Sequence, residues 1–186
     1  MAILIELILN KTKKGIQAIS LVENPAILTG FIHLAKESKE TKLKFAIDEE
    51  KHIVLGPALI PNVKIFRNAK SLGLDSDAYV YFSASTIKEI SEIYLSTLKN
   101  NEVTIDHEKD TDDVKMIESW IVEDSAKDKS AIYGFDLPVG TWCVAFKILN
   151  DDLWSKVKEG DLNGFSIEAD ALEIYQKENF LLKFKS

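Results

Sequence analysis

Short apolar runs, rich in β-branched and aromatic residues, recur along the chain and are separated by Gly, Pro, Asn and Asp. The clearest run, Thr141–Leu149, alternates large apolar side chains with smaller or polar ones, as a strand with two distinct faces does. Runs of this kind predict strands at Ile3–Leu9, Gly30–Ala35, Leu43–Ile47, His52–Ile60, Tyr79–Phe82, Val103–His107, Val114–Val122, Thr141–Leu149, Gly164–Tyr175 and Phe180–Phe184.

Two segments have apolar residues at the spacing of a helix instead. In Ser85–Lys99 they recur every three or four positions, and the stretch from Thr86 to Glu89 matches a capping box. The shorter segment, Asp152–Glu159, begins at an acidic cap and is followed by Gly160, the residue type that most often ends a helix.

Many strands with only two helices predict a mainly β fold. We expect a closed or nearly closed β-barrel with the helices packed outside it, and an α+β sandwich is the alternative. Polar residues 123–130 are expected to form an exposed loop, and residues 109–113 a hairpin turn. Because no internal repeat, low-complexity tract or linker occurs, residues 1–186 are expected to form a single domain.

Composition and charge narrow the functional classes. The chain has 46% hydrophobic and 28% charged residues, the balance of a globular protein, and its net charge of -7 with dispersed Lys and Arg argues against nucleic-acid binding. Its single cysteine, Cys143, excludes an internal disulfide and fits a reducing compartment. Glu6 interrupts the apolar start, and no run reaches the roughly 18 apolar residues of a membrane span. We expect neither a signal peptide nor a transmembrane segment.

Ser166 and His107 are the candidates for catalytic chemistry. Serine is a poor nucleophile until an adjacent base takes its proton, and histidine titrates near neutral pH. His107 ends a predicted strand beside an acidic turn, where it could act as a base at the rim of a cleft. Ser166 follows Gly164 in another predicted strand, and the alternative is a serine on a solvated polar face. The remaining histidines, His33 and His52, lie in apolar surroundings that favour a structural role.

A third group would be needed to hold the imidazole in the correct tautomer. Among Glu118, Asp151, Glu168 and Glu173 we favour Glu118, because a charge inside the apolar run 116–121 is costly unless it is paired. No metal or cofactor site is predicted, since three scattered histidines and one cysteine lack zinc-ligand spacing and no Gly-rich phosphate loop occurs. Cys143 lies in an apolar run and is predicted to be a buried, inert thiol.

Several segments carry a family resemblance through their order and spacing. They are Ile19–Ala26, Asp106–Glu108, Ile117–Val122, Pro138–Trp142, Trp154–Gly160 and Gly164–Glu168. In this arrangement the chain resembles the phage prohead (capsid maturation) proteases, particularly the XkdF-like phage serine proteases, over nearly its whole length.

The resemblance implies a fold similar to that of the herpesvirus assemblin proteases, a β-barrel surrounded by helices. It also implies that His107 is the general base and Ser166 the nucleophile of peptide-bond hydrolysis, with an acidic third residue in phage enzymes. Little of the sequence follows the serine, which favours an earlier carboxylate such as Glu118 or Asp151.

The implied function is a serine endopeptidase that cleaves the phage scaffold, the major capsid protein and itself during prohead maturation. Its location would be the assembling prohead in the host-cell cytoplasm, with self-association left open and without nucleic-acid or membrane partners. The alternative is a non-catalytic capsid-assembly or scaffold-binding protein with the same fold, and a third hypothesis is a binding module unrelated to phage. The protease hypothesis requires Ser166 and His107 to meet, whereas the others do not.

Overall fold

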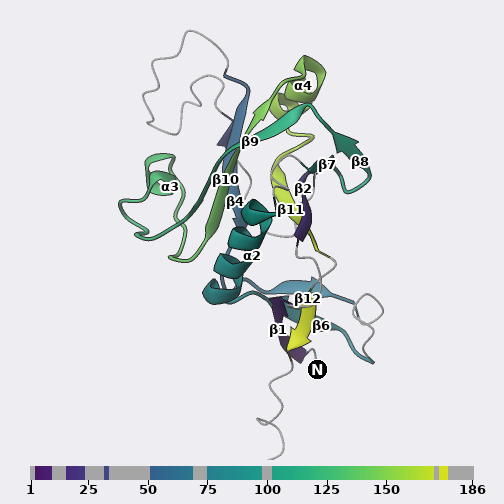
Figure 1. Ribbon diagram of the computed structural model, residues 1–186, viewed down its shortest axis with the longest axis vertical. Helices are drawn as coiled ribbons and strands as arrows, with labels where there is room; N and C mark the ends of the chain where they lie inside the picture. The colour runs from purple at the N-terminus through teal and green to yellow at the C-terminus, as the bar shows by residue number, and fades with distance from the viewer. Residues whose placement is uncertain are drawn as a thin grey trace, which may run out of the picture.

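The computed structural model describes residues 3–9, 16–23, 32–33, 51–68, 75–97, 102–169 and 172–175. Strands dominate these ranges, and three helices accompany them (Figure 1). The strands are β1 (Ile3–Leu9), β2 (Ile16–Val22), β3 (Ile32–His33), β4 (Ile53–Leu59), β5 (Ile65–Arg67), β6 (Ala78–Tyr81), β7 (Val103–Ile105), β8 (Lys109–Thr111), β9 (Val114–Ile121), β10 (Trp142–Ile148), β11 (Gly164–Ala169) and β12 (Leu172–Tyr175). The helices are α2 (Ala84–Ser96), α3 (Lys129–Ile132) and α4 (Asp151–Glu159).

The strands form three four-stranded sheets, with the orders β12-β1-β6-β5, β3-β4-β10-β9 and β11-β2-β7-β8. The mainly β class is therefore confirmed, but the predicted closed barrel is wrong for the part of the chain that the structure describes, because its sheets are open. The α2 helix contacts β1, β2 and β10, which is one strand from each sheet. The helix therefore packs where the three sheets meet. In a closed barrel, side chains of the strands themselves would fill the interior.

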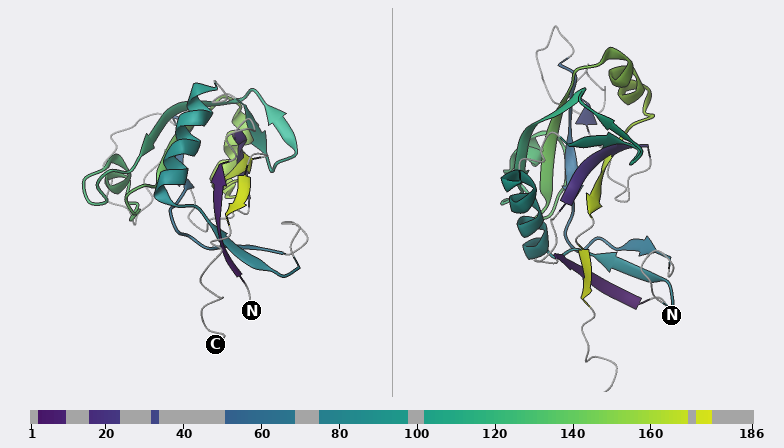
Figure 2. Two further views of the ribbon diagram at one scale, coloured as in Figure 1. Left: turned by 60° about the horizontal axis from the view of Figure 1, so that its bottom comes forward. Right: turned by 45° about the vertical axis from the view of Figure 1, so that its right-hand side comes forward.

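Segments far apart in the sequence pair in two of these sheets. β1 pairs with β12 and β2 with β11, both antiparallel, and each early strand also has a parallel partner, β6 or β7 respectively. The predicted single strand Gly164–Tyr175 is in fact these two strands, β11 and β12, which belong to different sheets (Figure 2). The division matters for function because it places Ser166 beside the early strand β2.

One cluster of buried side chains extends over all three sheets. Its densest part is β10, where Trp142, Val144 and Phe146 are all fully buried. Burial of a large apolar side chain contributes about 1.5–3 kcal/mol, so this strand is a major source of stability. The predicted alternation of β10 underestimates its burial, since Cys143 and Ala145 on its other face are buried as well.

The predicted helices are present with slightly different ends. α2 begins after Ser83, whose side chain accepts a hydrogen bond from Thr86 N at 3.4 Å, so the cap lies three residues before the predicted capping box. α4 begins after Asn150, whose Oδ1 accepts a hydrogen bond from Leu153 N at 3.0 Å. It ends at Gly160 as predicted, with the left-handed backbone that favours glycine (φ 86°).

Other predicted segments have mixed outcomes. Strands β2, β5 and β8 were not predicted, and β8 occupies the first residues of the expected 109–113 turn. The expected loop 123–130 contains the start of the short helix α3. The predicted strands Leu43–Ile47 and Phe180–Phe184 lie outside the described residues. None of the helices in the described ranges has both the length and the apolar character needed to span a bilayer.

Candidate active site

Ser166, Ser20 and Thr104 form a row of hydroxyl side chains across the sheet β11-β2-β7-β8. Ser166 is directly opposite Ser20 in the antiparallel pairing of β11 with β2, and Ser20 is beside Thr104 in the parallel pairing of β2 with β7. Residues directly opposite each other point to the same face, with their Cα atoms about 4.5–5.5 Å apart. Ser20 and Thr104 are buried, whereas Ser166 keeps partial solvent access. Ser166 is therefore the serine of the row that is open to solvent.

A tight turn joins β7 to β8 and carries His107. Asp106 and His107 both have left-handed backbone, with φ of 50° and 61°, and Glu108 N donates a hydrogen bond to Ile105 O at 3.0 Å. Positive φ at both central positions defines a type I′ turn, for which Asn-Gly is the preferred sequence. Asp and His are less favourable than Asn and Gly in this left-handed backbone. The cost is about 1–3 kcal/mol per residue, and strain of this kind is often found at functional sites.

The strained turn is held against the end of β2. Asp106 N donates to Leu21 O at 2.9 Å, and its carboxylate accepts a hydrogen bond from Glu23 N at 3.1 Å. His107 N donates to the Oγ of Ser20 at 3.0 Å. The surrounding structure thus fixes an otherwise unfavourable backbone at three points.

The bond from His107 to Ser20 settles the side of the sheet on which the turn lies. The turn must fold over the face to which Ser20 points, and Ser166 points to that same face from the other neighbouring strand. The backbone amide of His107 and the strand residue Ser166 are therefore both neighbours of Ser20, on two different sides of it. His107 is exposed there, and it lies in the turn rather than at the end of a strand as predicted.

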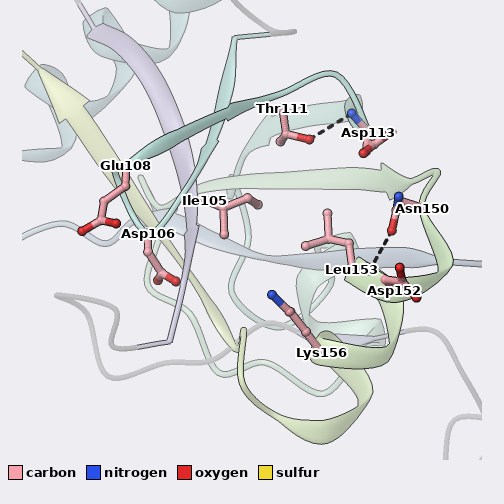
Figure 3. Close-up of a pocket in the computed structure, with 9 residues that line it drawn as sticks. All are labelled: Ile105, Asp106, Glu108, Thr111, Asp113, Asn150, Asp152, Leu153 and Lys156. Atoms are coloured by element: carbon pink, nitrogen blue, oxygen red, sulfur yellow. Dashed lines mark hydrogen bonds between the residues drawn. The ribbon is translucent and has the colours of Figure 1, made fainter.

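A hollow of about 400 Å³ lies on the other side of the same turn (Figure 3). It is bounded by β7, the segment leading into β9, and the first turns of α4, and its lining residues are Ile105, Asp106, Glu108, Thr111, Asp113, Asn150, Asp152, Leu153 and Lys156. Four of these are carboxylates and one is an amine, so the hollow is acidic. Because Ile105 alternates with Thr104 along β7, the hollow opens on the face opposite the hydroxyl row.

Glu118, the predicted third catalytic residue, lies on β9 in the sheet β3-β4-β10-β9. Its carboxylate is exposed and forms an ion pair with Lys129 of α3. The Lys129 ammonium also lies over the rings of Trp120 and Tyr133, at 5.1 and 5.7 Å from their centroids. Figures 1 and 2 show α3 and the β7–β8 turn on opposite sides of this sheet, so the structure does not bring Glu118 to His107.

The other predicted carboxylates are placed differently. Asp151 begins α4, and its Oδ1 lies 3.8 Å from Nδ1 of His52, whose ring stacks on Trp154 with centroids 4.8 Å apart. Asp151 thus faces the other histidine rather than His107. Glu168 belongs to β11 and Glu173 to β12, and their side chains lie outside the described part of the structure.

Two further predictions concern Cys143 and metals. Cys143 is fully buried in β10, and burial, with the charge of Asp128 adding to it, raises the pKa of its thiol to about 12. A thiol in this state does not form the reactive thiolate near neutral pH, which confirms the predicted buried and inert residue. Within the described ranges, no three His, Cys, Asp or Glu side chains converge as ligands for a metal ion.

Sequence reasoning did not recognise Ser20 as part of the site. The residue lies within one of the segments that carry the family resemblance, but the strand that contains it was not predicted. Its neighbours Ile19, Leu21 and Val22 are all buried, so the segment lacks the polar–apolar alternation of a half-exposed strand.

The family model described as "Putative phage serine protease XkdF" matches residues 41–175. The chain belongs to this family. No curated protein and no solved structure gave a match. The matched range of this XkdF-family chain includes both Ser166 and His107, whereas Ser20 precedes it. The relationship to herpesvirus assemblin proteases stays a prediction.

Proposed function

We propose that this XkdF-family protein is a serine endopeptidase with Ser166 as nucleophile and His107 as general base. The observation that carries the proposal is the hydrogen bond from His107 N to Ser20 Oγ at 3.0 Å, combined with the pairing of Ser20 with Ser166. Each of these contacts joins Ser20 to one member of the proposed dyad, which supports the proposal because the two members are distant in sequence. The family match supports the same chemistry independently.

In the proposed reaction, the Ser166 hydroxyl attacks a peptide carbonyl while the His107 imidazole accepts its proton. The imidazolium then protonates the leaving amine, and the acyl group stays on Ser166. A water molecule, deprotonated by His107, attacks the acyl-enzyme and releases the second product with the serine restored. The exposure of His107 suits this exchange, since the imidazole must meet first the substrate and then water.

The proposed substrates are the phage scaffold, the major capsid protein and the protease itself, cleaved inside the assembling prohead in the host-cell cytoplasm. The partly exposed Ser166 lies on β11, the outermost described strand of its sheet, which supports access by a polypeptide substrate. A peptide approaching this strand would meet the nucleophile without displacing a described strand of that sheet.

The third catalytic residue is a separate question. Glu118 was predicted from the sequence as the orienting carboxylate, but in the structure it pairs with Lys129, and this ion pair would have to open for Glu118 to reach His107. The proposal therefore rests on the dyad of Ser166 and His107, and substitution of Glu118 decides whether a carboxylate from β9 contributes.

The test is co-expression of the protein with the scaffold and capsid proteins of its phage, followed by analysis of the cleavage products. We expect Ser166→Ala to abolish cleavage of all substrates, including self-cleavage, while the protein stays folded by circular dichroism. Ser155→Ala is the matched control: this partly exposed serine of α4 donates its hydroxyl to Asp151 O at 3.0 Å, and its loss should leave cleavage intact.

Complete processing by the Ser166→Ala protein would overturn the proposal. Absence of cleavage by the unsubstituted protein, with retained binding to scaffold or capsid protein, would instead support the non-catalytic assembly role. Labelling by a fluorophosphonate, mapped to Ser166 by peptide mass spectrometry and lost in His107→Asn, would identify the nucleophile directly.

A further inference from the structure

Ser20 is a buried serine whose hydroxyl connects two segments of the candidate site. Its Oγ donates a hydrogen bond to Thr104 O at 3.3 Å and accepts one from His107 N at 3.0 Å. A hydroxyl has one proton to donate and two lone pairs to accept with, so both interactions can form at once. The side chain is fully buried, and its proton is directed to a carbonyl. Ser20 is therefore not available as a nucleophile, although it stands next to one.

The bond to Ser20 differs from the other anchors of the turn because it is made at the backbone of His107 itself. Two other anchors act on Asp106, through its amide and its carboxylate. Because the backbone of His107 is left-handed, with a φ of 61°, loss of this bond would weaken the restraint on that backbone and favour its relaxation toward more common angles. Such relaxation would move the imidazole relative to Ser166.

We propose that Ser20 is the positioning residue for the catalytic base, and that its hydroxyl sets the place of His107 relative to Ser166. The inference rests on the proposed function. It assigns a role to a residue outside the family match, which covers residues 41–175. Ser20 is well suited to the role because the same strand pairs with the strand of the nucleophile and holds the turn of the base.

The first test is the steady-state kinetics of Ser20→Ala on a peptide substrate derived from a mapped cleavage site. We expect kcat to fall about 10- to 100-fold with KM changed less than about twofold, because the base is displaced while the substrate surface is kept. Ser20→Thr retains the hydroxyl and should recover most of the lost kcat. If Ser20→Ala merely destabilised the protein, kcat would not fall selectively while KM stayed the same. The hydroxyl of Ser20→Thr would then not restore kcat.

Ser91→Ala is the matched control. Ser91 is also a buried serine that donates its hydroxyl to a backbone carbonyl, Lys88 O at 2.8 Å, but it lies on α2. Its removal should leave kcat unchanged within about twofold. An equal fall of kcat in Ser91→Ala and Ser20→Ala would overturn the proposal. It would show that loss of a buried hydroxyl anywhere in the fold lowers kcat, without a specific effect on His107.

Amide hydrogen exchange of the unsubstituted protein gives a second, independent readout, which also applies if Ser20→Ala does not fold. The His107 amide should exchange slowly although the turn is exposed, since its hydrogen is donated to a buried oxygen. Fast exchange of that amide, or full kcat in a folded Ser20→Ala protein, overturns the role of Ser20. A lack of peptidase activity in the unsubstituted protein overturns the proposed function instead. The two failures are distinguishable, because hydrogen exchange at His107 does not depend on activity.

Discussion

Ser166 stands directly opposite Ser20 in the antiparallel pairing of β11 with β2. This register decides which face of the strand carries Ser166, the proposed nucleophile, because neighbouring residues of a strand point to opposite faces. A slip by one residue would turn Ser166 to the face of the buried Phe165 and remove it from the side where His107 lies. Phe165 packs on Phe146 with ring centroids 5.4 Å apart, and this contact holds the register.

The two described histidines with left-handed backbone provide a matched pair of substitutions. His107 has a φ of 61° and His52 a φ of 51°, and asparagine tolerates such angles well. We expect His107→Asn to lower kcat/KM about 10³-fold or more, because the general base is lost. His52→Asn should retain activity and lose about 1 kcal/mol of stability with the stacking on Trp154. Peptide hydrolysis and thermal unfolding measure the two effects, and a similar loss of activity in both variants would contradict the assignment.

Substitution of the carboxylate on β9 tests the third catalytic position. Because Glu118 is engaged by Lys129 away from the β7–β8 turn, we expect Glu118→Gln to keep kcat within about threefold. The lost ion pair is partly exposed and should reduce stability by less than about 1 kcal/mol. Asp151→Asn, which changes the carboxylate beside His52, is the parallel measurement. A fall of about 10⁴-fold in kcat for either variant would place that carboxylate behind His107 in the working enzyme.

Alanine substitutions at two glycines distinguish the cost of steric crowding from the cost of backbone strain. Gly140 and Gly160 have nearly equal φ angles, 89° and 86°. A Cβ on Gly140 would meet the Cβ of Ala84 at 2.6 Å, whereas a Cβ on Gly160 would meet nothing within 4 Å. Gly160→Ala should therefore cost about 1–2 kcal/mol of unfolding free energy from strain alone. Gly140→Ala should cost more, since the start of α2 must also move, and equal costs in urea titrations would refute the close contact.

Acid sensitivity is expected from the cap of α3. Burial tends to raise the pKa of Asp128, but hydrogen bonds from Ser130 N, Trp120 Nε1 and Ser130 Oγ outweigh it and hold the pKa below its ordinary value of 3.8. A lowered pKa contributes stability above pH 3.8, and the contribution is lost as the pH falls through the folded-state value.

The measurement is the unfolding free energy of Asp128→Asn as a function of pH. At pH 7 the variant should be about 1 kcal/mol less stable than the parent, and the difference should shrink below pH 3.8. Asp112→Asn, at a fully exposed carboxylate, is the control and should show little change. A difference that persists unchanged to pH 2 would exclude the charge of Asp128 as its source.

Local pattern predicted much of the fold but not its assembly. The run Ile3–Leu9 was predicted with the bounds that β1 has, and α4 ends at Gly160 as expected. The pairing of β1 with β12 and of β2 with β11 joins segments that are far apart, and nothing in the local periodicity of one sequence specifies such partners. The predicted barrel failed for this reason: many of the strands were predicted, but their order in the sheets cannot be derived from local pattern.

The site shows a similar division. Ser166 and His107 were selected because of their chemistry and their neighbouring residues, but the turn that carries His107 was predicted as the end of a strand. Asp-His is not a usual type I′ sequence, so it did not indicate a turn. The acidic residues that follow led to a turn being predicted at 109–113 instead. Ser20 was missed because a buried hydroxyl acquires its meaning only from the atoms it contacts, here His107 N and Thr104 O.

The pairing of β2 with β11 has a consequence for the timing of activity. Ser20 and His107 are synthesised well before Ser166, and β11 can join the sheet only after its own residues have left the ribosome. A growing chain that stops before β11 carries the proposed base and its support but not the proposed nucleophile. The proposed dyad therefore cannot act on a neighbouring chain, or on its own, before β11 has been synthesised and has paired with β2.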